Sequence, residues 1–246
     1  MKESHVYTPY IYAWKTRRRE QYMKVYNIAI DGPAGAGKST IAKTIAKKLS
    51  YIYIDTGSMY RAIAYYMLVQ GIDTKDAEKV IKACDFVNVT IEYIDGEQQV
   101  ILNGENVTDK LRKEEVGITA STVAKYEPVR GKMVHLQRQL AKSSNVIMDG
   151  RDIGTVVLPE ADLKVFLTAS SFVRAKRRFN ELNEKGISCN LEEIEQDIIN
   201  RDEQDMTRLI SPLKQAEDAI LVDTSDMTIN EVVDTIINLF HDKINR

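Results

Sequence analysis

The sequence predicts an α/β fold built around a five-stranded parallel sheet. Three observations predict it: five short apolar runs suited to buried strands, a segment of helical spacing after four of them, and a glycine-rich turn between the first run and its helix. The runs begin near Val25, Tyr51, Asn145, Lys164 and Ala219. Because strands that alternate with helices form parallel sheets covered on both faces, we expect helices on both sides of this sheet.

The first run ends at Asp31 and leads into GPAGAGKST, which fills every fixed position of the phosphate-binding P-loop pattern. Glycines let the backbone approach a polyphosphate, Lys38 adds a point charge, and Ser39 can hold Mg²⁺. A fortuitous glycine turn is the alternative, but the strand before it and the helix after it favour a three-layer fold of P-loop NTPase type. The expected ATP-binding residues are Gly32, Pro33, Ala34, Gly35, Ala36, Gly37, Lys38, Ser39 and Thr40.

The composition suits a cytoplasmic enzyme. A chain of 246 residues with 43% hydrophobic and 28% charged residues is long enough for one α/β domain with a smaller appended part. A formal charge of −2 gives no bulk argument for binding nucleic acid or membrane, and no apolar stretch reaches transmembrane length. Cys84 and Cys189 lie outside any CxxC or Cys/His cluster, so neither a zinc site nor a disulfide framework is indicated.

The segment Met1–Tyr22 is aromatic and basic, without helical or alternating periodicity. We expect a dispensable extension, because tolerated additions concentrate at chain termini. An RNA-binding arm or a presequence-like peptide is the alternative, since Trp14 and the three arginines from Arg17 to Arg19 can stack on bases and pair with phosphates.

The second strand ends at Asp55 and is followed by Thr56 and Arg61. Ligands of open parallel sheets bind beyond the carboxyl ends of the strands, so these side chains are candidates for a binding site. Helix capping is the alternative role for Asp55 and Thr56, and a surface salt bridge is the alternative for Arg61.

The third strand also ends in reactive side chains. Asp149 has the position of a Walker B carboxylate, which contacts Mg²⁺ directly or through water. Arg151 offers a planar fork for phosphate, and Asp152 offers an acceptor for an amino group. A solvated charged turn is the alternative. Because three strands end in such side chains at the same edge of the sheet, a binding site is favoured over that alternative.

Alternating apolar residues over about 86–108, with a turn at Asp95 and Gly96, predict an antiparallel β insert. Helices are expected at about Lys110–Ala124 and Pro128–Ala141. Ser121 and Arg130 flank the break between these helices, and on their own they read as surface polar residues.

A charged segment of helical spacing, at about residues 200–212, is either a lid that excludes water or a solvated helix face. In the second case Arg201 and Asp205 would form an i,i+4 ion pair. Arg208 ends this segment.

Several short motifs follow one another along the chain: GPAGAGKST, IDTGSMYRA, ASTVA, PVR, DGRDIGTVVLP, RDEQDMTR and SPL. In this order and at these spacings they resemble the bacterial cytidylate kinase family from about Lys24 onward. Many families share the first motif, whereas DGRDIGTVV together with RDxxDxxR is specific to this one. The resemblance implies a nucleoside-monophosphate kinase fold. It divides the chain into the extension 1–22 and a kinase domain 23–246, with core 23–54 and 143–246, CMP-binding part 55–142, β insert 86–108 and lid 200–212.

Matching positions assign the expected CMP-binding residues to three groups. Ser121, Arg130 and Asp152 would recognise the cytosine. Arg61, Arg151 and Arg208 would surround the phosphate, and Arg201 and Asp205 would hold the sugar. Thr56 is also expected to bind CMP. The expected catalytic residues are Lys38, Arg151 and Arg208, and the expected Mg²⁺ ligands are Ser39 and Asp149.

The implied reaction is transfer of the ATP γ-phosphoryl group to CMP or dCMP, with Mg²⁺ as cofactor. Because the acceptor is already a phosphate oxygen, little general-base help is required. The implied partners are ATP and CMP or dCMP, without nucleic acid or membrane, and we expect a monomer.

Overall fold

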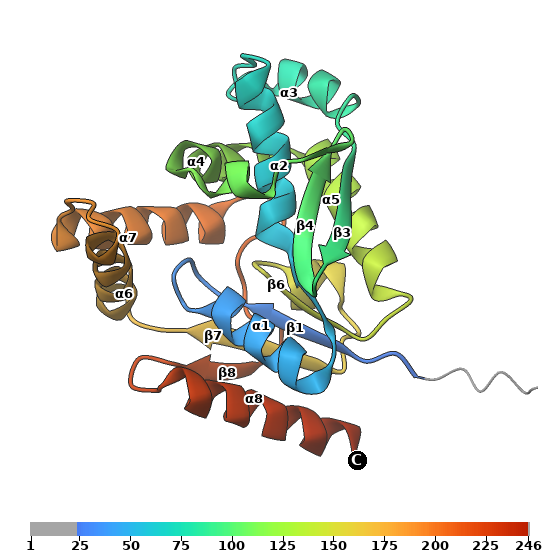
Figure 1. The fold of residues 1–246 in the computed structure, drawn as a ribbon, viewed down its shortest axis with the longest axis vertical. Helices are drawn as coiled ribbons and strands as arrows, with labels where there is room; N and C mark the ends of the chain where they lie inside the picture. Colours follow the sequence, from blue (N-terminus) through green and yellow to red (C-terminus); the bar gives the residue numbers. More distant parts are fainter. Residues whose placement is uncertain (1–23, 246) are drawn as a thin grey trace, which may run out of the picture.

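A computed structural model describes residues 24–245 of the chain, so the expectations for Met1–Tyr22 lie outside the described residues. At its centre is the expected five-stranded parallel sheet, in the order β2-β6-β1-β7-β8 (Figure 1). The strands are β1 (Asn27–Asp31), β2 (Ile52–Asp55), β6 (Val146–Gly150), β7 (Leu163–Thr168) and β8 (Ile220–Asp223). The α-helices are α1 (Lys38–Leu49), α2 (Thr56–Val69), α3 (Ala77–Cys84), α4 (Glu114–Val123), α5 (Glu127–Ala141), α6 (Ser171–Glu184), α7 (Leu191–Thr207) and α8 (Ile229–Ile244).

Helices cover both faces of the sheet, as expected for parallel strands. Successive side chains of a strand point to opposite faces, so Ile28 and Ile30 of β1 pack in the cluster that contains α1 and α8, whereas Ala29 packs in the cluster of α2 and α5. Phe240 of α8 is 1% exposed and contacts two tyrosine rings edge-on. The sheet therefore separates two cores, and its strands read as continuous apolar runs because both faces are buried.

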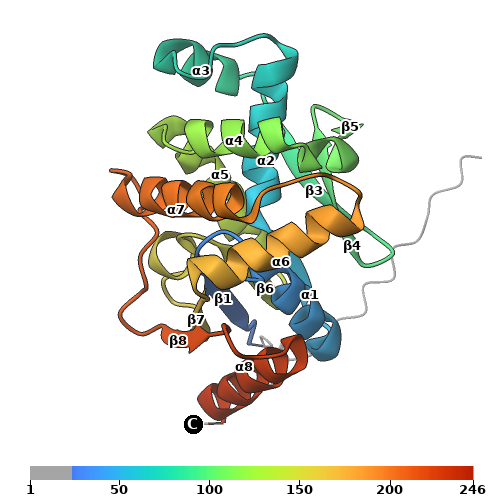
Figure 2. The same ribbon diagram turned by 90° about the vertical axis from the view of Figure 1, so that its left-hand side faces the viewer.

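The predicted β insert is a second sheet, in which β3 (Val89–Ile94), β4 (Glu97–Leu102) and the short β5 (Glu105–Asn106) pair in antiparallel order. Asp95 and Gly96 both have positive φ, of 53° and 79°, as a two-residue hairpin turn requires. Figure 1 shows β3 and β4 beside α2, and Figure 2 shows α6 and α7 side by side across the front of the molecule.

Two local features differ from the expectation. The helix expected over Lys110–Ala124 begins only at Glu114, because Lys113 is extended (φ −65°, ψ 142°) and separates it from a 3-10 turn at Thr108–Arg112. A π-helical turn at Ile153–Val157 follows β6 and was not expected. Asp31 of β1 accepts hydrogen bonds from two backbone amides of that turn, so a distant residue imposes its shape.

No helix formed by residues 24–245 has the length and apolar character that a bilayer crossing requires.

Candidate active site

The phosphate-binding loop is shaped by two glycines. Gly32 has a φ of +149°, and a Cβ atom there would lie 1.9 Å from the carbonyl oxygen of Leu167 on β7. Gly37 has a φ of +86° and precedes α1 directly. Side chains are disfavoured at both positions, and the free N–H groups of the first turn of α1 point toward the loop. The loop therefore has the geometry of an anion site at a helix N-terminus.

Lys38 opens α1 and lies buried beneath this loop, with 6% of its surface exposed. Its Nζ donates a hydrogen bond to the carbonyl oxygen of Pro33 at 2.7 Å. Burial and, to a lesser extent, the nearby Arg151 together lower the pKa of Lys38 to about 7, although Asp149 opposes both effects. A bound phosphate would favour the charged form of the ammonium, so the site is suited to an anion.

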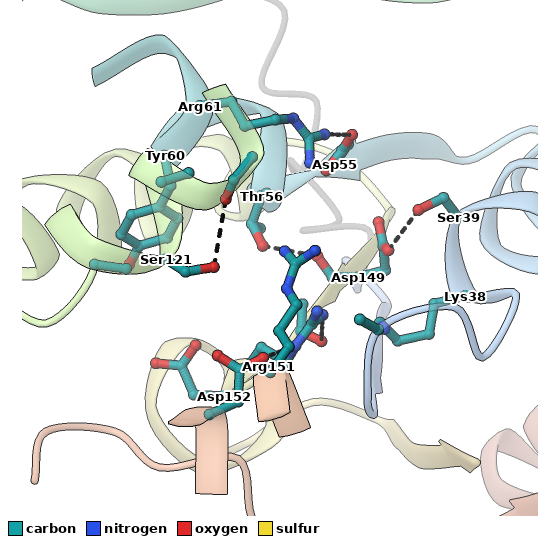
Figure 3. A pocket seen from close by; sticks show the side chains of 18 of the residues that line it. Lys38, Ser39, Asp55, Thr56, Tyr60, Arg61, Ser121, Asp149, Arg151 and Asp152 are labelled. Carbon is teal, nitrogen blue, oxygen red and sulfur yellow. Dashed lines mark hydrogen bonds and ion pairs between the residues drawn. The ribbon is translucent and has the colours of Figure 1, made fainter. Parts of the chain in front are cut away.

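Ser39 and Asp149 face each other beside the loop (Figure 3), and Tyr53 hydrogen-bonds the same carboxylate. The Ser39 hydroxyl donates to Asp149 Oδ2 at 3.0 Å, and the Tyr53 hydroxyl donates to Oδ1 at 2.9 Å. Burial and, to a lesser extent, the neighbouring Asp55 together raise the pKa of Asp149 to about 6, although Lys38 opposes this rise. Residues 24–245 contain no cluster of three or more His, Cys, Asp or Glu side chains suited to a metal. A cation held by this hydroxyl and carboxylate would take its other ligands from water and substrate, as Mg²⁺ commonly does.

Asp55 and Arg61 follow strand β2 and contact each other. Asp55 Oδ1 accepts from the Ser58 amide at 3.0 Å and caps α2, while Oδ2 pairs with Arg61 Nη2 at 2.9 Å. The capping role considered for Asp55 is therefore present, and so is the ion pair considered for Arg61. The Thr56 hydroxyl donates instead to the carbonyl oxygen of Asp149 at 2.7 Å, which ties β2 to β6 at the edge of the cleft.

Arg130 and Asp152 form a buried ion pair, with 3% and 4% of their surfaces exposed. Arg130 also donates to the carbonyl oxygen of Ala124 at 3.1 Å, and its guanidinium lies 5.3 Å from the centre of the Tyr60 ring. The alternative surface role considered for Arg130 is wrong, because its side chain is buried. Ser121, on α4, is half-buried, and its hydroxyl contacts the backbone of its own helix.

Asp205, near the end of α7, links two arginines. Its carboxylate pairs with Arg151 Nε at 2.8 Å and with Arg208 Nη1 at 3.6 Å. Burial alone would raise the pKa of Asp205, but Arg151 and Arg208 hold it below the usual value. Among the ion pairs of the described residues there is none between Arg201 and Asp205, so the i,i+4 pair considered from the sequence is not formed.

All nine residues predicted to bind CMP line one cleft of about 260 Å³, together with Lys38, Ser39 and Asp149 (Figure 3). Of the predicted ATP-binding loop, Ala34 and Gly35 also line it. The remaining loop residues are not among those that line this cleft: Gly32, Pro33, Ala36, Gly37 and Thr40. The elements that contribute to the cleft lie far apart in sequence, and the carboxyl edge of the sheet brings them together.

The sequence reasoning missed four residues near this cleft. Tyr60 lines it, and its hydroxyl is buried without a hydrogen-bond partner within residues 24–245. The Tyr53 hydroxyl donates a hydrogen bond to Asp149, which lines the cleft, and Asp31 accepts one from the π-helical turn. Arg174 of α6 is buried and donates to the loop carbonyl of Ala34 at 2.9 Å. Only Tyr60 carried a signal, since it adjoins Arg61 within a matched motif.

The charges of the cleft favour an anionic ligand. Six cationic side chains line it against four carboxylates. Within the described residues, Arg208 Nη2 and Arg130 Nε are buried and have no hydrogen-bond partner. Because a buried charged donor without a partner is costly, a ligand with several acceptor oxygens would stabilise this arrangement.

The fold and the cleft define a P-loop protein that binds phosphorylated ligands at the carboxyl edge of a parallel sheet. Comparison with known proteins narrows this class, because residues 28–242 match the family described as Cytidylate kinase. The cytidylate kinase of Caldicellulosiruptor saccharolyticus is 52% identical over 219 residues, which cover 89% of this chain and 97% of that protein. The cytidylate kinase of Shouchella clausii is 50% identical over 88% of this chain and 96% of that protein. The chain belongs to the cytidylate kinase family.

A solved structure of shikimate kinase from Acinetobacter baumannii is similar over 89% of this chain and 94% of that one, at 15% identity. Its TM-score of 0.44 is too low to carry an argument about substrate or mechanism.

Proposed function

We propose that the protein transfers the γ-phosphoryl group of ATP to CMP or dCMP, giving ADP and CDP or dCDP. The observation that carries the proposal is the single cleft that joins the phosphate-binding loop, at Lys38 and Ser39, to the buried pair of Arg130 and Asp152. Donor and acceptor nucleotides can therefore meet end to end. Membership of the cytidylate kinase family supports the same reaction.

The proposed acceptor site uses the three groups of residues expected from the sequence. Ser121, Arg130 and Asp152 would read the cytosine at the buried end of the cleft. Arg61, Arg151 and Arg208 would surround the phosphate, and Arg201 and Asp205 would hold the sugar. Thr56 is the ninth proposed CMP-binding residue. Arg151 and Arg208 share Asp205 as a carboxylate partner, so their guanidinium groups are already oriented before a substrate arrives.

Catalysis in this proposal is positioning plus charge stabilisation. The attacking atom is a phosphate oxygen of the acceptor, so no side chain is needed to remove a proton. Lys38 and the arginines would neutralise the charge on the transferred group, and the loop amides would hold the donor phosphates in line with the acceptor. No covalent intermediate with the protein is required.

We propose Ser39 and Asp149 as the residues that hold Mg²⁺. A hydroxyl and a carboxylate that face each other at 3.0 Å supply oxygen ligands, which this ion prefers. When bound, the ion would neutralise negative charge on the donor phosphates. The Tyr53 hydroxyl donates to the other carboxylate oxygen at 2.9 Å, so Tyr53 would orient the ligand.

Tyr53→Phe tests this assignment. Removing a hydrogen bond that orients a metal ligand typically costs about 10- to 100-fold in metal affinity or activity, so we expect half-maximal activity to require about tenfold more Mg²⁺. The measurement is the reaction rate against Mg²⁺ at fixed ATP and CMP. Tyr93→Phe is the matched control, because its hydroxyl donates to the backbone carbonyl of Tyr53 and not to Asp149. An unchanged Mg²⁺ requirement in Tyr53→Phe would argue that Asp149 needs no orienting partner.

The decisive experiment for the function is a coupled ADP-release assay with ATP constant and AMP, CMP, GMP and UMP as acceptors. CMP should be used with the highest kcat/KM. A preference for another acceptor would indicate a different small-molecule kinase with the same loop. Binding without turnover would indicate a nucleotide switch, although the sequence has no NKxD motif of the kind that reads guanine.

We propose that the kinase domain spans residues 23–246 and that Met1–Tyr22 is dispensable for catalysis. The first strand of the core, β1, begins at Asn27, after this segment. A chain that starts at Met23 should keep nearly the full kcat/KM for CMP, because additions at chain termini are commonly tolerated. A large loss in a truncated protein that still melts cooperatively would show that the segment contributes to the site.

We also propose that the enzyme acts as a monomer in the cytoplasm. Light scattering during size-exclusion chromatography tests the monomer directly.

A further inference from the structure

Strand β2 lies at the edge of the parallel sheet, with β6 on one side only. Along a strand, the backbone N–H and C=O groups of alternate residues point to opposite sides. Ile52 donates its N–H to the carbonyl oxygen of Asn145 beside β6, at 2.9 Å. The backbone groups of Tyr53 and Asp55 therefore point to the open side, where they need other partners.

Side chains of the β insert supply partners for three of these four backbone groups. The Tyr93 hydroxyl donates to the carbonyl oxygen of Tyr53 at 3.0 Å. Gln98 Oε1 accepts from the Asp55 amide at 2.8 Å, and its Nε2 donates to the Asp55 carbonyl oxygen at 3.3 Å. The hairpin of β3 and β4 thus docks on the edge of the sheet through side chains, without adding a sixth strand.

The chemistry of its partners determines the orientation of the Gln98 amide. The Asp55 N–H can only donate, so Oε1 faces it, and the Asp55 carbonyl can only accept, so Nε2 faces that. Nε2 also donates to Ser58 Oγ at 2.8 Å, while the Ser58 hydroxyl gives its own proton to the Asp55 carbonyl at 2.7 Å. With the amide flipped, its oxygen would face the carbonyl oxygen of Asp55, and its NH2 group would face the Asp55 N–H.

Asp55 is also the residue that holds Arg61. Its backbone is held by Gln98, and its carboxylate pairs with Arg61 Nη2 at 2.9 Å. We infer that Gln98 is a positioning residue for the phosphate-binding arginine Arg61, acting through Asp55. The inference rests on the proposed function in so far as Arg61 contacts the acceptor phosphate. In this arrangement the β insert acts on the acceptor side of the cleft through Gln98 and Asp55.

Gln98→Met removes the amide and keeps the length of the side chain. We expect KM for CMP to rise about tenfold, the order of effect of losing one or two hydrogen bonds, with kcat and KM for ATP within about twofold. Gln99→Met is the matched control, because Gln99 adjoins Gln98 and its side chain accepts a hydrogen bond from Asn106 of the insert, at 3.1 Å, and none from Asp55. Gln98→Glu keeps an acceptor for the Asp55 amide but loses the donor to its carbonyl, and should shift KM in the same direction if Gln98→Met does not fold.

A double-mutant cycle with Arg61→Ala separates positioning from general destabilisation. If Gln98 acts through Arg61, Gln98→Met should change KM for CMP by less than about twofold in the Arg61→Ala background. A full tenfold increase in that background, or an equal rise in KM for ATP, would overturn the inference.

The ADP-release assay with AMP, CMP, GMP and UMP is run first on the wild-type enzyme. Failure of the proposed function is then distinguished from failure of the inference about Gln98. If another monophosphate is preferred, the cycle is measured with that acceptor. If none is phosphorylated, the cycle is measured by calorimetric binding of inorganic phosphate, and additive effects of Gln98→Met and Arg61→Ala overturn the inference.

Discussion

Replacing Lys38 by alanine is expected to lower kcat for CMP by about 10²- to 10³-fold, the cost of losing one preorganised charge-stabilising group in an active site. Nζ lies buried under the phosphate loop, 2.7 Å from the Pro33 carbonyl, and Asp31 and Asp149 are close enough to influence its pKa. It is therefore placed to act on bound phosphates. Coupled ADP release measures the loss, and an unaltered kcat would overturn the assignment of this loop to ATP.

The same substitution should leave the fold intact. Burial lowers the pKa of Lys38 from 10.5 to about 7, which means that the folded protein disfavours its charge. Between these two pH values the unfolded chain binds the proton and the folded chain has released it, so the contribution of Lys38 to stability rises with pH. Lys38→Ala should lack this rise and should melt no lower than the wild type at neutral pH. Melting temperatures of both proteins across this range test the expectation.

The parallel sheet was predictable because each of its strands is a local signal. An apolar run such as that of β1 or β6 is buried on both faces, and turn-forming or charged residues follow it directly. The hairpin turn at Asp95 and Gly96 is equally local, since its two positive φ angles suit these residue types. Local signals of this kind do not depend on the rest of the fold.

The π-helical turn at Ile153–Val157 was not predictable in this way. Its first amides are held at 2.8 Å and 2.7 Å by the two carboxylate oxygens of Asp31, a residue more than a hundred positions away. Burial raises the pKa of Asp31 to about 6, and the two amides oppose that rise. A conformation imposed by a tertiary contact leaves no periodicity in the segment that adopts it.

The residue types of the candidate site were predictable, but their pairings were not. The motifs located Arg201 and Asp205 on one helix, where i,i+4 spacing favours a pair. In the structure Asp205 instead bonds Arg151, which reaches it from the end of β6 at 2.8 Å. Charged side chains at one sheet edge choose partners by three-dimensional proximity, and one sequence alone does not contain those distances.

Asp152→Asn is expected to lower kcat/KM for CMP by about 10- to 100-fold, the effect of losing a hydrogen bond to a charged acceptor. In the proposed site the Asp152 carboxylate accepts from the exocyclic amino group of cytosine. An amide in its place can donate to O4 of uracil, so UMP should lose less than CMP, or gain. The CMP/UMP ratio should narrow by about the same factor, measured with both acceptors at fixed ATP.

Asp152 also pairs with the buried Arg130, so Asp152→Asn leaves that guanidinium without its counter-charge. Such a loss is destabilising, and a melting curve shows how much of the protein remains folded at the assay temperature. KM for ATP is the second control, because it should stay nearly constant if Asp152 belongs to the acceptor site.

Arg130→Met separates the two roles of Asp152. This substitution breaks the same ion pair but keeps the carboxylate, so it removes any contribution that Asp152 makes only by orienting Arg130. If Asp152 reads the cytosine amino group directly, the CMP/UMP ratio should narrow more in Asp152→Asn than in Arg130→Met, since only the first variant offers a donor to O4 of uracil. Equal ratios in the two variants, or equal losses of CMP and UMP activity in Asp152→Asn, would assign Asp152 to structural support of the cleft.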